Sequence, residues 1–118
     1  MTADTDIDAA AAAPDVVAVL TTLPAEADAA AFAETLVTER LAACVSIGAP
    51  MISVYVWNGA VERASERQLF LKTVRAKVPA IKARLAALHP YDVPELLVVP
   101  VIGGGDAYLE WVRESTAG

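Results

Sequence analysis

The spacing of apolar and polar residues predicts strands that alternate with amphipathic helices. Residues 16–20 form a short apolar run with the character of a strand, and we expect the fold to begin near Asp15. Across residues 25–42, apolar side chains recur every three or four positions, while charged side chains occupy the other face. This spacing predicts an amphipathic helix that begins just after Pro24.

A long β-hairpin is predicted in the middle of the chain. Residues 44–47 and 52–57 are rich in strand-forming side chains, and Asn58-Gly59 supplies a two-residue turn that favours positive φ angles. Counting back from this turn pairs Trp57 with Ala60, Tyr55 with Glu62 and Cys44 with Thr73. Both arms would then be about 14 residues long, whereas strands usually have ~5–6 residues. Pro50 and the polar residues 62–68 predict a bend or bulge along the way.

The last third of the chain predicts a helix, a strand and a second short helix. The first of these covers residues 77–88, ends before Pro90, and has a buried stripe made of Val78, Ile81, Leu85 and Leu88. Residues 96–102 form a buried strand, in which Pro100 belongs on an edge or at a bulge because it cannot donate a ladder hydrogen bond. A glycine turn at 103–105 then leads to a helix that is capped by Asp106 and carries Tyr108, Leu109, Trp111 and Val112.

The order βαββαβ plus a terminal helix predicts an α+β fold of the ferredoxin-like, split βαβ type. Its sheet is antiparallel with two helices on one face, and the first hairpin arm and the strand with Pro100 form its edges. Residues 51–66 would extend ~8 residues, roughly 25 Å, beyond the part of the sheet that the helices cover. Because an exposed apolar edge ribbon invites pairing, we expect a closed homo-oligomer of two or three copies.

Composition narrows the class of protein. The 118 residues suffice for one domain, which we assign to residues 15–118, and the Ala- and Asp-rich residues 1–14 are expected to be a disordered tail. A formal charge of −6 without a basic cluster disfavours nucleic acid and anionic lipid as partners. No apolar run approaches the ~20 residues of a membrane span. A single cysteine, Cys44, excludes an internal disulfide and favours the cytoplasm.

Several segments together resemble the CutA divalent-cation tolerance proteins over residues 16–113. They read ERLAACV at 39–45, YVWNG at 55–59 followed by Glu66 and LKT at 71–73, HPYDVPE at 89–95, and YLEW at 108–111. The resemblance implies a ferredoxin-like subunit similar to the nitrogen-regulatory PII proteins and a homotrimer built through the long hairpins. It also implies tolerance of copper and other divalent metals, copper binding, a response to metal ions, and no established enzymatic reaction.

Cys44 and His89 are the candidate metal ligands. A thiolate is a soft donor that suits copper, and His89 is the only imidazole in the chain. Each residue also has a structural alternative, because a free cysteine often packs as a small hydrophobe and a histidine at a helix end can bond the terminal carbonyls. Since one chain offers too few soft ligands for a closed site, donors would have to come from several copies or from shared carboxylates.

Six further residues are candidates for an interface or a pocket wall: Trp57, Glu66, Lys72, Tyr91, Asp92 and Glu95. The last three lie in a turn that two prolines hold rigid, where an aspartate usually bonds its own backbone. Glu66 and Lys72 are expected on the second hairpin arm as a charge pair worth about 1 kcal/mol or less.

Three functions remain open. The first is a trimeric copper-binding tolerance protein, with a further protein partner that the sequence does not identify. The second is a PII-like sensor that holds small anionic effectors in clefts between subunits, although few basic residues are present to line them. The third is an enzyme with Cys44 as nucleophile and His89 as base, which requires the two side chains to lie within hydrogen-bond reach.

Overall fold

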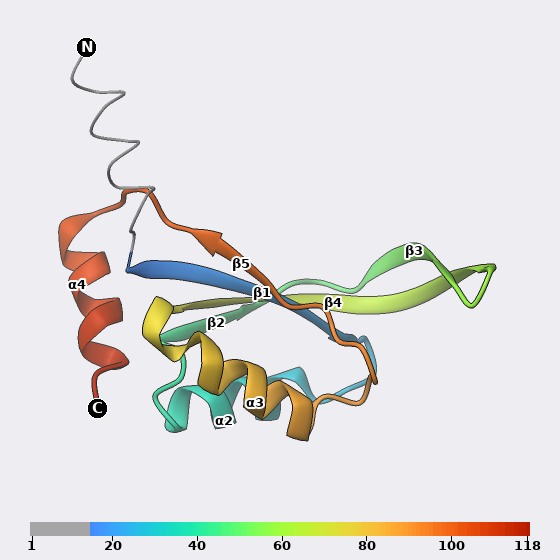
Figure 1. Ribbon diagram of the computed structural model, residues 1–118, viewed down its shortest axis with the longest axis horizontal. Coiled ribbons are helices and arrows are strands. Elements are labelled where there is room, and N and C mark those ends of the chain that lie inside the picture. The colour runs from blue at the N-terminus through green and yellow to red at the C-terminus, as the bar shows by residue number, and fades with distance from the viewer. Residues whose placement is uncertain (1–14) are drawn as a thin grey trace, which may run out of the picture.

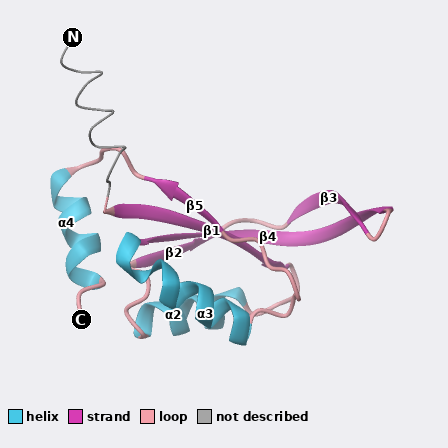
Figure 2. Cartoon of the chain, in the orientation of Figure 1, coloured by secondary structure: helices cyan, strands magenta, loops and turns pink. Residues whose placement is uncertain are grey.

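The fold is an antiparallel sheet with helices on one face, as predicted (Figures 1 and 2). The computed structural model describes residues 15–118, so the disordered tail predicted for residues 1–14 lies outside the described part. Along the chain the elements are β1 (Val16–Pro24), α2 (Ala29–Thr38), β2 (Cys44–Ile47), β3 (Met51–Trp57), β4 (Ala60–Val74), a 3-10 turn η1 (Arg75–Lys77), α3 (Val78–Leu88), β5 (Leu97–Pro100) and α4 (Asp106–Ser115). The strand order is β2-β4-β1-β5, and β3 pairs with β4. The edges are therefore the first hairpin arm and the strand with Pro100, as predicted.

Helix α2 is shorter than its apolar spacing predicts. It begins at Ala29 because the Asp28 side chain accepts the Ala31 N–H at 3.0 Å, which caps the first turn. At the other end Arg40 adopts φ 60°, and the Leu41 N–H donates to the Leu36 carbonyl at 2.9 Å. This left-handed closure ends the helix, so the predicted helix over residues 25–42 is wrong at both ends.

The core lies between the sheet and the helices α2 and α3. One face of β1 and β4 packs against it through alternate residues, and its fully buried members include Val17, Val19, Leu36, Leu69, Leu71, Ile81 and Leu85. Leu88, predicted to belong to the buried stripe of α3, is instead 39% exposed. Because α3 ends at Leu88 and the next residue is extended, His89 takes the buried position in its place.

The opposite face of the sheet is exposed over its middle. We use the term open face for the side chains that point away from α2 and α3: Ala18, Leu20, Cys44, Ser46, Phe70, Lys72, Leu97 and Val99. Strand β5 is exposed throughout, with Leu97 at 54%, so the prediction of a buried strand is wrong for the single chain. The reason is its position, since an edge strand has no neighbour on one side and no helix covers this face of it.

Helix α4 packs at one end of the sheet (Figure 1). Its residue Val112 is buried together with Val16 and Ala43. Asp106 lies in the first turn, and the cap residue is Gly105 without a side-chain hydrogen bond, so the predicted Asp106 cap is displaced by one residue. Among the described residues, no helix has the length and apolar content that a membrane crossing requires.

Candidate functional site

A bulge in the long hairpin decides which way Cys44 faces. Near the turn the predicted register holds, with Trp57 opposite Ala60 and Tyr55 opposite Glu62, and Asn58 and Gly59 both have positive φ. Further from the turn, Met51 lies opposite Glu66, whereas Ile47 lies opposite Leu69. Three residues, 48–50, therefore face only two, 67 and 68. The predicted bulge is confirmed, and the Gly48 N–H donates to the Gln68 carbonyl at 2.8 Å across it.

The extra residue shifts every pair beyond it by one position. Cys44 therefore lies opposite Lys72, and the predicted pair with Thr73 is wrong. Thr73 is fully buried beneath the helices, while Lys72 points to the other side of the sheet. Because strand side chains alternate between faces, a shift of one residue turns Cys44 from the core to the open face.

On the open face, Cys44 is half-buried beside a lysine and a serine. The Lys72 ammonium donates a hydrogen bond to the Ser46 hydroxyl and lies 4.0 Å from the Cys44 sulfur. The Ser46 hydroxyl oxygen is also 4.0 Å from that sulfur. Among residues 15–118, the charged group beside the thiol is thus the Lys72 ammonium, which opposes a metal cation at the same point.

His89 lies within the helix layer, and both of its ring nitrogens are hydrogen-bonded. The ring is 8% exposed, packs edge-on against Phe32, and its Nδ1 accepts the Tyr91 N–H at 3.1 Å. The proton is therefore on Nε2, which donates to the Thr22 carbonyl at 2.6 Å. The expected structural partner was the end of α3, but the ring bonds β1, and the backbone N–H of His89 reaches Leu85 instead.

The structure does not bring Cys44 and His89 together within one chain. Cys44 is opposite Lys72 on the open face, whereas His89 bonds Thr22, which pairs with Gln68 on the same strand as Lys72. Four residues of a strand separate these positions, which corresponds to ~13 Å, and the two side chains also lie on different sides of the sheet. Across residues 15–118, no group of three or more His, Cys, Asp or Glu side chains is arranged to hold a metal.

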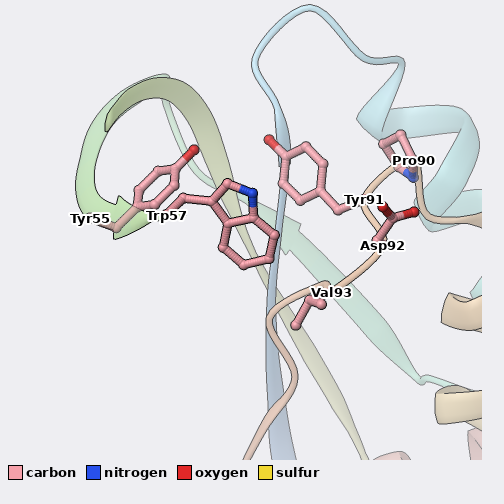
Figure 3. Close-up of a pocket in the computed structure, with 6 residues that line it drawn as sticks. All are labelled: Tyr55, Trp57, Pro90, Tyr91, Asp92 and Val93. Atoms are coloured by element: carbon pink, nitrogen blue, oxygen red, sulfur yellow. The ribbon is translucent and has the colours of Figure 1, made fainter. Parts of the chain in front are cut away.

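Four of the six predicted wall residues do meet, where the hairpin faces the loop after α3. The Tyr91 hydroxyl donates to Glu66, which is 6% exposed, at 2.9 Å. Burial of the phenol and, after it, the hydrogen bond to the Glu66 carboxylate together raise the pKa of Tyr91 to about 12. Beside this bond lies a cavity of about 330 Å³ that Figure 3 shows, lined by Tyr55, Trp57, Pro90, Tyr91, Asp92 and Val93. We call it the hairpin–loop pocket.

The other two predicted wall residues lie elsewhere. Glu95 accepts a hydrogen bond from the Gln68 amide at 2.8 Å, and Lys72 belongs to the open face. Glu66 and Lys72 are six positions apart on one strand, or ~20 Å, so they do not form the predicted charge pair. Tyr55 was missed as a wall residue, although its position two residues before Trp57 on a strand puts both rings on one face.

A second cavity, of about 530 Å³, lies on the α3 side of the same loop. Its lining includes Lys82, Leu85 and His89, and it shares Pro90, Tyr91 and Asp92 with the hairpin–loop pocket. The loop at 90–92 is therefore the wall between the two cavities. The hydrogen bonds from Tyr91 to both Glu66 and His89 hold that wall in place.

Comparisons with known proteins agree with one another. A family model described as CutA1 divalent ion tolerance protein matches residues 17–115. The divalent-cation tolerance protein CutA of Thermus thermophilus is 46% identical over 98 residues, which are 83% of this chain and 95% of that protein. The chloroplastic protein CutA of Arabidopsis thaliana is 40% identical over 85% of this chain, but the match spans only 55% of the plant protein.

Solved structures give the same result. The divalent cation tolerance protein from Thermus thermophilus superposes with a TM-score of 0.83 at 44% identity, covering 86% of this chain and 99% of the other. CutA1 from Oryza sativa superposes with a TM-score of 0.84 at 37% identity, covering 87% and 94%. This chain therefore resembles these proteins in both fold and sequence over most of its described length.

Proposed function

Because this chain belongs to the CutA1 divalent ion tolerance protein family, we propose that it is a cytoplasmic homotrimer that binds copper or another divalent cation, and that it is not an enzyme. The observation that carries the assembly is the exposed hairpin. Strand β3 pairs with β4 alone among the described strands, and the tip projects from the body of the subunit (Figure 1). Its exposed aliphatic side chains, Ile52, Val54, Val56 and Val61, share one face of the hairpin, whereas Tyr55 and Trp57 lie on the other.

Two further features support the same assembly. The open face adds Phe70, Leu97 and Val99, each at least 40% exposed in the single chain. At the other edge, β5 presents a second unpaired strand side. An apolar sheet face between two unpaired edges favours association in water. A ring of identical copies would cover the face and both edges at once. The number three follows from the family resemblance.

The metal proposal depends on the assembly, because the donors of one chain do not fit a closed copper site. Both nitrogens of His89 are already bonded, and among residues 15–118 Cys44 is not part of any group of three metal-ligating side chains. Cys44 is the better candidate because it lies on the face that neighbouring copies would cover, where thiols from several chains can meet. For His89 to bind a metal, the ring would have to give up a hydrogen bond to Thr22 or to Tyr91.

Two measurements test this function. Light scattering should give three times the chain mass of 12.3 kDa, and a monomer would contradict the assembly. Copper titration should then compare wild type with Cys44→Ser and His89→Gln. We expect Cys44→Ser to lose copper affinity and His89→Gln to keep it. Unchanged affinity in both variants would remove both residues as ligands.

Within one chain, the geometry does not support the pairing of Cys44 with His89 that the enzyme hypothesis needs. A nucleophile and its base must lie within hydrogen-bond reach, whereas the polar neighbours of Cys44 are Ser46 and Lys72, and those of His89 are Thr22 and Tyr91. The remaining alternative is a small-ligand sensor, which the hairpin–loop pocket favours. The expected anionic effector does not suit that pocket, because no lysine or arginine lines it.

A further inference from the structure

We propose that the hairpin–loop pocket is a binding site for a small organic cation with an alkylated ammonium head. Its walls include three aromatic rings, Tyr55 and Trp57 from the hairpin and Tyr91 from the loop, and in the view of Figure 3 the Trp57 indole lies between the two tyrosine rings. Pro90 and Val93 add apolar surface, and Asp92 supplies a carboxylate. Aromatic faces attract an ammonium ion through the ring quadrupole, and they do so best when several rings surround it.

The charged side chains that line the pocket or bond its walls are acidic. Asp92 lines it, and the buried Glu66 carboxylate lies behind the Tyr91 ring. Glu62 is the cross-strand neighbour of Tyr55. The raised pKa of Tyr91 follows first from burial and then from Glu66, Tyr55 and Glu26, so a negative charge on the phenol is disfavoured there. Of these causes, the carboxylates of Glu66 and Glu26 would attract a cation in the same place.

Other ligand classes fit less well. An anion would meet carboxylates without a compensating lysine or arginine in the lining. A metal ion would find one lining carboxylate and three rings, and no cluster of metal-ligating side chains exists among residues 15–118. A neutral apolar molecule would gain the ring contacts but would leave Asp92 without a counter-charge. A volume of about 330 Å³ is at the small end for ligand pockets, which suits a compact ligand.

This site goes beyond the proposed metal function and does not depend on it. Neither Cys44 nor His89 lines the hairpin–loop pocket. Binding of the organic cation should therefore persist in a metal chelator and in Cys44→Ser. Failure of copper binding leaves this site intact, and failure of this site leaves the copper proposal intact.

Choline and its uncharged isostere 3,3-dimethyl-1-butanol provide the probe pair. The full chain has two tryptophans, so a Trp111→Phe background leaves Trp57 as the sole indole reporter. Choline chloride should change the Trp57 emission in a saturable way, with EDTA present and total chloride held constant with NaCl. The isostere should bind roughly tenfold more weakly, since it keeps the shape and loses the charge. Equal binding of both compounds, or no saturable change with choline, would refute the proposal.

A pair of charge variants locates the site. Asp92→Asn should weaken choline binding roughly tenfold, whereas Asp106→Asn removes the same charge from α4 and should leave the affinity unchanged. If the two variants behave alike, only net charge matters and the pocket is not the site. If the Trp57 emission responds to protein dilution and not to choline, another copy of the chain fills the pocket, which also refutes the proposal.

Discussion

Replacing His89 by alanine distinguishes two possible roles of this residue, a structural role and a role as a metal ligand. The ring makes two hydrogen bonds, from Nε2 to the Thr22 carbonyl at 2.6 Å and from the Tyr91 N–H to Nδ1 at 3.1 Å, and it is 8% exposed. Each bond contributes about 1 kcal/mol net, and the cavity left by the ring adds about 1 kcal/mol more. We therefore expect the free energy of unfolding of the metal-free protein to fall by about 3 kcal/mol.

The assay is urea denaturation in EDTA at one fixed protein concentration, because an oligomer unfolds in a concentration-dependent way. His89→Gln is the matched control. Its amide N–H can still reach the Thr22 carbonyl, so we expect it to recover about 1 kcal/mol of the loss. If His89→Ala unfolds within about 0.5 kcal/mol of wild type without metal and yet fails to bind copper, the ring is a ligand and our structural assignment is wrong.

Three further predictions concern single interactions. Asp28→Ala should lower the free energy of unfolding by about 1 kcal/mol through loss of the α2 cap, while Asp28→Asn should keep most of it; equal losses would contradict the capping role. In an ultraviolet pH titration Tyr91 should ionise near pH 12, and Glu66→Gln should lower that pKa. Because the folded pKa is raised above 10.0, the stability tied to the neutral phenol is complete below pH 10.0 and is lost as pH rises through about 12. The bidentate bond from Arg113 lowers the pKa of Asp15, so its stabilisation is complete above pH 3.8 and is lost as pH falls through the lowered pKa. A double-mutant cycle on that exposed pair should give less than about 1 kcal/mol of coupling at neutral pH.

Most of the fold could be predicted because short stretches of sequence determine where its turns, edges and helices lie. Asn58-Gly59 forces the turn, Pro100 forces an edge, and the spacing of Ile81 and Leu85 gives the buried side of α3. The errors occur where a tertiary contact overrides the pattern. The Leu41-to-Leu36 bond ends α2 early, and burial of His89 displaces Leu88 from the core.

The candidate site was less predictable because it depends on register. A bulge was expected from Pro50, but the sequence does not say how many residues it adds, and one residue decides the face of Cys44. Trp57 from the hairpin and Tyr91 from the loop line the same pocket, and no local spacing in the sequence encodes that arrangement. Glu66 was assigned to the hairpin correctly, but its partner is a phenol 25 positions away and not the lysine on its own strand.

The bulge also explains why the two proposed sites can act independently. If the same chain paired straight back from the turn without a bulge, Cys44 would lie opposite Thr73 on the core side, and the open face would carry no thiol. With the bulge, the thiol lies on the sheet surface that copies would share. Trp57, next to the hairpin turn, and Tyr91 line the separate hairpin–loop pocket, and Glu66 accepts the hydrogen bond that holds Tyr91. Deleting Ala49 tests this reasoning, because residues 48 and 50 would then face residues 68 and 67 while the pairs on both sides stay as they are. Cys44 should therefore remain opposite Lys72 and react with a thiol reagent at the wild-type rate in the folded protein. A deletion variant that folds but protects Cys44 from the reagent would show that the bulge does more than absorb one residue, and our account of the register would be wrong.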